Sequence, residues 1–374
     1  MSVERMTTLV ARALKLSPQQ LLDCFIPATA DHLAGVLALR HALFGAGIYW
    51  DDVAYLCWRY RFGSTTQGRG NCWVLLLDGQ VAGMVGTEEV LLQRGNERVA
   101  AWSTMDIAID PRYEGSGLGS WMNLRLCQAA GCAITIGSNE KSRNMITRTF
   151  RRLPNRRSYV LPIRFQRLLT KRIRVPIIAS VLAPIIGAMA AAWRTLALLG
   201  AQRRLQFKTI TCFDRDAADL LPRAVDPQEW QLARSVDYLN WRLFGNPRVR
   251  YRVVGAYDHG VLAGFMATML RGERGGPLVV VLSDWVVERA RFRPVFKALC
   301  ADAVRLAVSS GAESVNVTAY HARSENLLRR LGFTPRFGAY ETVAVYSTDK
   351  AKLLELHAPA PWFITEANTD RDNL

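Results

Sequence analysis

The sequence predicts a mixed α/β protein in which two tandem domains, each built on a mixed sheet, are joined by an apolar, basic-flanked helical segment. Three observations lead to this fold class. A glycine-rich turn separates a strand pattern from a helix pattern within residues 106–132. Several motifs of the first half recur about 180 residues later. The length of 374 residues also exceeds what one hydrophobic core usually holds.

We divide the chain where pattern and composition change. In the N-terminal part, Ser17, Pro18 and Gln20 predict a helix start with a capping box. The predicted parts are an N-terminal helical extension (1–24), a first domain (25–165), a basic and apolar helical insertion (166–205), a second domain (206–348) and a C-terminal tail (349–374).

The glycine-rich turn has the layout of a phosphate-binding site. Ile107 and Ile109 alternate with smaller or polar neighbours, as a half-buried strand requires. Three glycines follow at every second position from Gly115 to Gly119, and they let the backbone approach an anion closely. Apolar residues at helical spacing occupy residues 120–132. The free N–H groups of the turn and the positive end of the helix dipole are therefore predicted to point at one place.

The repeated motifs indicate a duplicated domain. Residues 55–59 recur at 238–242 as Tyr-Leu-x-Trp-Arg, and the strand that begins at Asp106 matches one that begins at Asp284. A repeat of this length is a whole domain and not a solenoid unit.

The two copies differ at the turn. When the Asp106 and Asp284 strands are aligned, the three glycines fall on Arg293, Val295 and Lys297 of the second copy. Side chains at these positions block a close backbone approach. We therefore predict that the first half binds a phosphate-bearing cofactor. The second half is predicted to be structural or to supply part of the pocket for the group that accepts from this cofactor.

The order strand, Pro-x-Tyr-x-Gly-x-Gly-Leu-Gly turn, helix, strand and helix resembles the acyl-CoA-binding core of the GNAT acyltransferase superfamily. The resemblance covers residues 25–165 and 206–348. It departs from the family at Glu114, where an Arg or Gln is usual. The Tyr-Leu-x-Trp-Arg motif and the tail at 361–372 resemble GNAT proteins of bacterial surface-polysaccharide gene sets. Trp362 and Phe363 are expected to dock, with the tail carboxylates Glu366, Asp370 and Asp372 facing a positively charged acceptor; a frayed acidic tail is the alternative.

The resemblance implies transfer of an acetyl or other short acyl group from acyl-CoA, the co-substrate, to a primary amine. The expected acceptor is a small-molecule or lipid-linked amine, an amino sugar of a cell-surface polysaccharide or glycolipid precursor. The residues expected to bind acyl-CoA are Ile107, Ile109, Gly115, Ser116, Gly117, Leu118, Gly119, Ser120 and Asn144.

Acyl transfer to an amine needs a base for the ammonium and an acid for the thiolate. Asp106, at the start of the strand, is the candidate base, and a structural strand-end carboxylate is the alternative. The family's usual acid is a Tyr, but that register gives Phe150 in the first half and Leu328 in the second. Water, Tyr159 or another hydroxyl is expected to replace it, unless the step is unassisted.

The net charge of +16 is concentrated in one segment. No acidic residue lies between Glu140 and Asp214, a stretch that holds sixteen Lys and Arg. Inside it, residues 175–193 carry no charge and could nominally cross a bilayer. Pro176 and Pro184 favour two successive helices that lie on an anionic inner-membrane surface. Packing between the halves and a dimer contact are the alternatives.

The sequence also bears on other classes of protein. Its seven cysteines form no C-x-x-C pair, so a cytoplasmic protein with reduced thiols and no metal is expected. Basic tandem GNAT folds also resemble Fem-type aminoacyl-tRNA-dependent transferases, but the glycine turn favours a small donor over nucleic acid. A catalytically silent binding or scaffold protein is the remaining alternative. The oligomeric state stays open.

Overall fold

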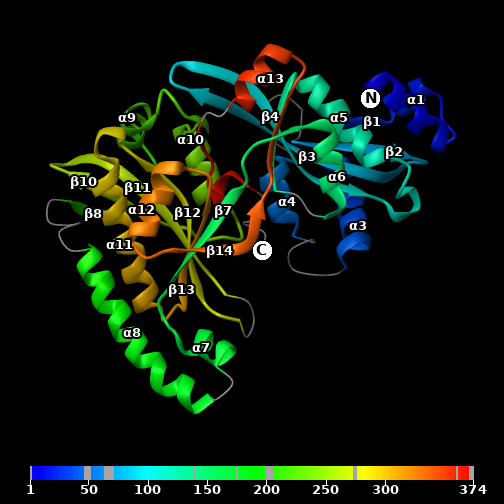
Figure 1. Cartoon of the computed structure of the whole chain (residues 1–374). Coiled ribbons are helices and arrows are strands. Elements are labelled where there is room, and N and C mark those ends of the chain that lie inside the picture. Colours follow the sequence, from blue (N-terminus) through cyan, green and yellow to red (C-terminus); the bar gives the residue numbers. More distant parts are fainter. Residues whose placement is uncertain are drawn as a thin grey trace.

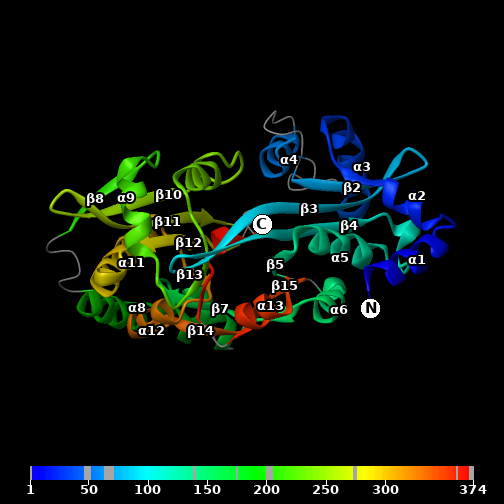
Figure 2. The ribbon, with the colours of Figure 1, turned by 90° about the horizontal axis from the view of Figure 1, so that it is seen from above.

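The computed structural model describes residues 2–45, 52–62, 71–137, 140–173, 176–198, 205–272, 276–358 and 361–369. Two mixed sheets lie side by side, each with helices packed on its faces (Figure 1; Figure 2). The predicted mixed α/β fold is confirmed.

The hydrophobic core of the first half lies between the first sheet and the helices that pack on it. Its strands, in spatial order, are β1 (Phe25–Pro27), β2 (Cys72–Leu77), β3 (Gln80–Arg94), β4 (Glu97–Ile109), β5 (Cys132–Ile136), β15 (Val343–Ser347) and β6 (Arg151–Arg152), with β9 (Trp230–Leu232) on β3 and β16 (Trp362–Phe363) on β9. Its helices are α1 (Val3–Ala13), α2 (Pro18–Asp23), α3 (Leu33–Phe44), α4 (Val53–Tyr60), α5 (Leu118–Ala130), α6 (Glu140–Thr149) and α13 (Lys350–His357).

The second sheet repeats this arrangement in the C-terminal half. Its strands, in spatial order, are β14 (Thr334–Glu341), β7 (Arg156–Pro162), β13 (Ser314–Ala319), β12 (Val279–Val287), β11 (Val261–Arg271), β10 (Arg252–Asp258) and β8 (Gln206–Ile210). Its helices are α9 (Arg215–Ala224), α10 (Val236–Leu239), α11 (Phe292–Ser309) and α12 (Ala322–Arg330). The hairpin of α7 (Gln166–Arg172) and α8 (Pro176–Leu198) lies at the outer edge of this half (Figure 1).

The halves exchange strands, and β9 of the predicted second domain pairs with β3 of the first sheet. Strand β7, from the predicted first domain, pairs with β13 and β14 of the second sheet. Strand β15, from the predicted second domain, pairs with β5 and β6 of the first sheet. Accordingly, Tyr159 and Leu161 belong to the core of the second half, and Val343 and Val345 to that of the first. The sheets therefore do not coincide with the sequence ranges 25–165 and 206–348.

The repeated Tyr-Leu-x-Trp-Arg motifs meet where the halves touch. Trp58 and Trp241 stack with ring centroids 5.1 Å apart. Each indole Nε1 donates a hydrogen bond to the backbone carbonyl of the other tryptophan, at 3.1 Å and 3.4 Å. Equivalent residues that exchange equivalent bonds are the signature of a pseudo-twofold contact. The duplication read from the sequence is thus also a symmetry of the structure.

Each sheet opens at its central parallel strands. Strands β4 and β5 pair only at Trp102 with Ala133 and Ser103 with Ile134, and they part beyond these residues. The register of β4 on β3 shifts just there, and Asp106 adopts a positive φ of 49°. Such a bulge bends a strand away from its neighbour. The opening lies at the carboxyl ends of the parallel strands, where open α/β sheets bind ligands.

The insertion departs from the prediction in one respect. Helix α8 runs without a break from Pro176 to Leu198, so the expected pair of helices divided at Pro184 is wrong. Pro184 removes the hydrogen bond to the carbonyl of Ser180. Both residues are exposed, so water can satisfy that carbonyl and the helix continues.

Candidate functional site

Asp110 and a short 3-10 helix, Pro111–Tyr113, connect β4 to the glycine turn, which leads into α5 at Leu118. Gly115 and Gly117 have φ values of +84° and +81°, a region that side chains other than glycine rarely adopt. A Cβ on Gly115 would meet nothing within 4 Å, and one on Gly117 would meet only Val10 of α1, at 3.7 Å. Gly119 instead lies against Ile109, 3.3 Å from a would-be Cβ. The first two glycines thus leave open space, and the third lets α5 pack closely on β4.

Backbone donors in the turn remain available. The Ser116 hydroxyl donates to the Tyr113 carbonyl at 2.7 Å and accepts from the N–H of Leu118 at 3.3 Å. Among the described residues, none accepts a hydrogen bond from the N–H groups of Gly117, Gly119 and Ser120. These groups lie at the positive end of a 13-residue helix. This is a cradle for an anion.

Glu114, the departure from the family motif, is exposed at the edge of this cradle. The neighbouring Arg112 pairs with Asp110, with 2.8 Å between Nη2 and Oδ2. That pair lowers the pKa of the Asp110 carboxyl, chiefly through the hydrogen bond from Arg112. Arg112 is therefore engaged with Asp110 beside the cradle.

Asp106 lies on β4, three residues before Ile109. Its Oδ2 accepts a short hydrogen bond from the hydroxyl of Tyr60 and lies 4.0 Å from Nη1 of Arg40. The Asp106 side chain is 12% exposed, whereas Arg40 is almost fully buried. Burial, together with the charge of Asp106, raises the pKa of Tyr60 well above its usual range. Tyr60 thus remains protonated and holds one carboxylate oxygen; Oδ1 accepts no hydrogen bond from any described residue.

The equivalent carboxylate of the second half is engaged differently. Both oxygens of Asp284 accept hydrogen bonds from Arg234, at 2.7 Å and 3.0 Å. Oδ1 also accepts from the hydroxyl of Thr365 and the N–H of Trp285, each at 2.9 Å. A carboxylate with this many donors at 1% side-chain exposure is held as a structural anion. Of the two repeated aspartates, Asp106 alone has an oxygen open to chemistry.

Tyr159 does not join Asp106. Tyr159 lies on the exchanged strand β7 in the second sheet, where its hydroxyl donates to Glu325 at 2.7 Å. Asn144 is exposed on α6. Phe150 is buried and packs against Tyr346 of the exchanged strand β15, so its position offers no hydroxyl. The structure assembles Ile107, Ile109 and the glycine turn around the end of β4, next to Asp106.

Tyr60 and Arg40 are the site residues that sequence reasoning missed. Tyr60 directly follows the repeated motif at 55–59, and Arg40 is the lone arginine of an otherwise apolar helix. A charge at such a helix position signals a buried partner. The sequence nevertheless contains no information that the partner is Asp106.

The C-terminal tail docks as expected through Trp362 and Phe363, which are buried between the halves. The expectation that Glu366 faces an acceptor is wrong. Glu366 is 4% exposed and lies 3.6 Å from Arg271 and 3.9 Å from Arg156. Its charge is therefore balanced by the buried Arg156 and the partly exposed Arg271. Asp370 and Asp372 lie outside the described residues.

In each half, a bulged strand (β4 or β12) separates from its parallel neighbour (β5 or β13) and leads into a helix (α5 or α11). The positive N-terminal end of that helix faces outward. This is the GNAT fold in tandem, and comparisons with solved structures agree. A GCN5-related N-acetyltransferase from Anabaena variabilis matches with a TM-score of 0.60 and 13% identity, over 88% of this chain and 74% of that one.

Two further solved structures have a similar fold. An N-myristoyltransferase from Saccharomyces cerevisiae with bound myristoyl-CoA has a TM-score of 0.55 and 12% identity, over 87% of this chain and 83% of that one. A tandem GNAT protein from the clavulanic acid biosynthesis pathway has a TM-score of 0.50 and 13% identity, over 86% and 96%. No protein-family model and no curated protein sequence matches this chain. Identities this low establish the fold alone.

Proposed function

We propose that this chain transfers an acyl group from acyl-CoA to a primary amine, with the donor bound in the first half. The observation that carries the proposal is the turn of open glycines and free N–H groups, which continues β4 beyond the point where β4 leaves β5. It suits a pyrophosphate at the helix end and a thin pantetheine arm along the strand. The acetyl- and myristoyltransferases among the structural neighbours agree with such a donor.

In this proposal each residue has a defined task. The amine nitrogen attacks the thioester carbonyl carbon, the C–N bond forms, and the C–S bond breaks. Asp106 takes the proton that the ammonium must lose, and Tyr60 keeps the carboxylate oriented. Backbone N–H groups near Ile107 polarise the carbonyl. The leaving thiolate takes a proton from a water molecule, which in turn receives the proton that the nitrogen loses as the amide forms, because neither Tyr159 nor Phe150 presents a hydroxyl there.

The proposed acceptor is an amino sugar on a nucleotide or lipid carrier. Its support is the resemblance of the Tyr-Leu-x-Trp-Arg motif and of the tail to polysaccharide-linked GNAT proteins. A free-thiol assay with acetyl-CoA tests it against a panel of amino sugars, nucleotide-linked amino sugars, amino acids and polyamines. Turnover with the sugar amines is expected. CoA release with none of the amines would favour a silent binding protein.

We also propose that the protein acts on the inner surface of the membrane, held there by α8. One helix segment, Ile177–Thr195, is long and apolar enough to cross a bilayer by length and composition, and it is mostly exposed. Ile177, Val181 and Met189 are 76%, 59% and 68% exposed. Helix α8 itself lies at the outer edge of the second half (Figure 1). Exposed basic residues of the preceding hairpin arm, Arg167 and Arg172, suit anionic headgroups.

Flotation tests this location. With anionic liposomes at low salt the protein should float, because insertion of the apolar face adds to about 1 kcal/mol for each basic residue near the surface. Binding should weaken severalfold with neutral liposomes or at high salt. The variant Ile177→Ser, Val181→Ser, Ile185→Ser should stay at the bottom.

The matched control replaces three apolar residues of similar exposure elsewhere, Val261→Ser, Leu270→Ser and Leu354→Ser. This control should still float. If both variants float as well as the wild type, α8 is a packing element and the membrane proposal is wrong.

A further inference from the structure

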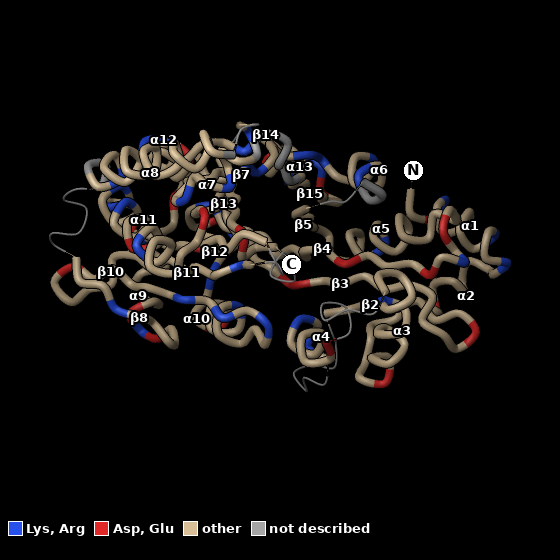
Figure 3. Tube along the Cα trace, turned by 90° about the horizontal axis from the view of Figure 1, so that it is seen from below, with Lys and Arg blue, Asp and Glu red and all other residues tan. Residues whose placement is uncertain are grey.

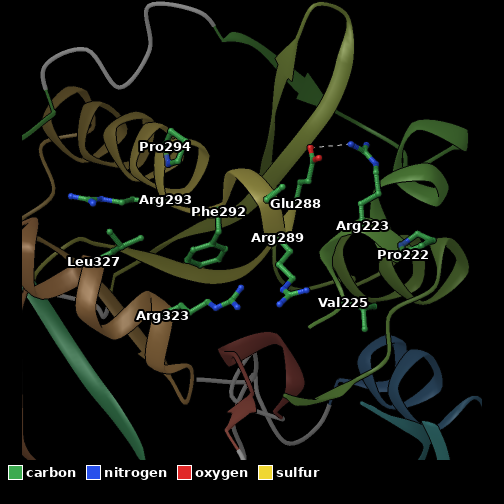
Figure 4. Close-up of a pocket in the computed structure, with 11 residues that line it drawn as sticks. Pro222, Arg223, Val225, Glu288, Arg289, Phe292, Arg293, Pro294, Arg323 and Leu327 are labelled. Carbon is green, nitrogen blue, oxygen red and sulfur yellow. Dashed lines mark hydrogen bonds and ion pairs between the residues drawn. The ribbon is translucent and has the colours of Figure 1, made fainter. Parts of the chain in front are cut away.

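The second half contains a cavity where the first half has its glycine turn. A basin of about 880 Å³ lies at the N-terminal end of α11, lined by Arg223, Glu288, Arg289, Phe292, Arg293 and Arg323 among others (Figure 4). A chamber of about 590 Å³ adjoins it and shares Arg289, Phe292 and Arg323 as walls. As the sequence predicts, side chains at the start of α11 keep a ligand from approaching the backbone closely. The side chains build a different site.

The basin walls are basic, and two of the arginines converge. Figure 4 shows Arg289 and Arg323 extending toward the same space, and Arg293 lies on another part of the basin wall. Arg289 and Arg323 are 47% and 42% exposed, and both contact Asp226. Arg223 pairs with Glu288 at 3.0 Å. The four arginines of the basin outnumber the two carboxylates, Asp226 and Glu288, so the basin has a net positive charge. Half-exposed guanidinium groups can bind phosphate oxygens bidentately.

The backbone adds to this positive field. Helix α11 is 18 residues long, and its N-terminal turn has no side-chain cap. The partial positive charge of its N-terminus therefore faces the basin together with the arginines.

The chamber behind the basin suits an organic group. Its walls include Phe292, His321, Phe363 and Trp285, and the Phe292 and Phe363 rings pack on His321 with centroids 5.2 Å and 4.5 Å away. His321 Nε2 lies 3.2 Å from Glu229, a second polar wall of the chamber. The Trp285 indole N–H is buried and has no hydrogen-bond partner among the described residues.

An extended pantetheine arm cannot follow β12 as proposed for β4, because the chain's own tail closes that path. Tyr320 at the end of β13 pairs with Ile364, with N–H to carbonyl distances of 2.9 Å and 3.0 Å. Phe363 fills the adjoining space against Trp285. The ligand of this cavity must therefore be compact.

The cavity is also remote from Asp106. The part of the first half that lines the chamber is the tip of the β3–β4 hairpin, Gly95 and Asn96, which reaches across to the second half (Figure 2). Asp106 lies ten residues further along β4, which at about 3.3 Å per residue is roughly 30 Å away. A ligand in this cavity does not enter the reaction at Asp106.

We propose that the second half binds a nucleotide-sized organic phosphate, with its phosphates between Arg289 and Arg323 at the end of α11 and its organic part in the aromatic chamber. This site is separate from the acyl-CoA site and does not depend on the proposed acyl transfer. In this site arginine side chains bind the phosphates, whereas in the first half the glycine backbone is proposed to bind them.

Calorimetry with ADP tests the proposal in the variant Gly117→Asp, which removes the anion cradle of the first half. One ADP per chain should bind. Inorganic pyrophosphate should bind more weakly, and adenosine should give no measurable heat. Arg289→Gln with Arg323→Gln should weaken ADP binding at least about tenfold. The conservative pair Arg289→Lys with Arg323→Lys should retain most of it and guards against misfolding.

Lys297→Gln is the matched control, because it removes one charge from the same helix and Lys297 is not among the residues that line the basin or the chamber. It should change ADP affinity less than about twofold. Absence of ADP heat in Gly117→Asp, or equal losses in the control and the double variant, would overturn the proposal. Acetyl-CoA binding by the Arg289→Gln, Arg323→Gln protein reports on the first half separately.

Discussion

Gly117→Asp is expected to abolish acyl-CoA binding, with a loss of affinity of at least about 100-fold, or ~2.7 kcal/mol. The substitution places a carboxylate at the N-terminus of α5, where N–H groups and the helix dipole would otherwise receive pyrophosphate. A non-glycine residue at φ +81° also strains the turn by about 1–2 kcal/mol. Calorimetry with acetyl-CoA measures the affinity, and thermal unfolding measures the strain.

Gly260→Asp separates these two effects. Gly260 has φ +83° in a hairpin turn of the second half, and its Cβ position is equally open. It should lose similar stability but keep acetyl-CoA affinity within about twofold. Equal affinity in Gly117→Asp and the wild type would remove the donor site from the first half.

Asp106→Asn is expected to lower the acyl-transfer rate about 100-fold while acetyl-CoA affinity stays nearly constant. Asn adopts the left-handed backbone of this bulge as readily as Asp, and its amide oxygen can still accept from Tyr60. The change therefore removes basicity and leaves shape. Steady-state kcat, measured beside the acetyl-CoA affinity, separates loss of the base from loss of binding.

Asp284→Asn is the matched control, since it changes the equivalent residue of the second half. It breaks a buried pair with Arg234 and should destabilise the fold by about 3 kcal/mol. The transfer rate per folded molecule should nevertheless stay close to that of the wild type. Unchanged turnover in Asp106→Asn would make Asp106 a structural carboxylate as well.

Local pattern predicted the parts of the fold that are close in sequence. The strand into the turn and the helix after it are confirmed, with β4 ending at Ile109 and α5 beginning at Leu118. The capping box is confirmed too, because the Ser17 N–H donates to the Gln20 side chain at 2.8 Å and the Gln20 N–H to the Ser17 hydroxyl at 3.2 Å. These features depend on residues within one turn of each other.

The errors concern partners far apart in sequence. Tyr159 was placed by proximity to the first domain, but a strand pairs with whichever sheet edge completes its core, and β7 completes the second. The charge of Glu366 suggests an exposed position, but the side chain is buried beside Arg156 and Arg271. Tyr60 and Asp106 are 46 residues apart, and no periodic pattern in the sequence reveals their contact. Only the assembled sheet reveals which groups share the site.

Hydrogen–deuterium exchange with and without acetyl-CoA tests the central claim most directly. If the bare turn of the first half holds the donor, amide exchange should slow in residues 106–120, where strand and turn N–H groups would acquire partners. Residues 284–297 of the second half should exchange at unchanged rates. Slowed exchange confined to residues 284–297, with none in residues 106–120, would contradict this account.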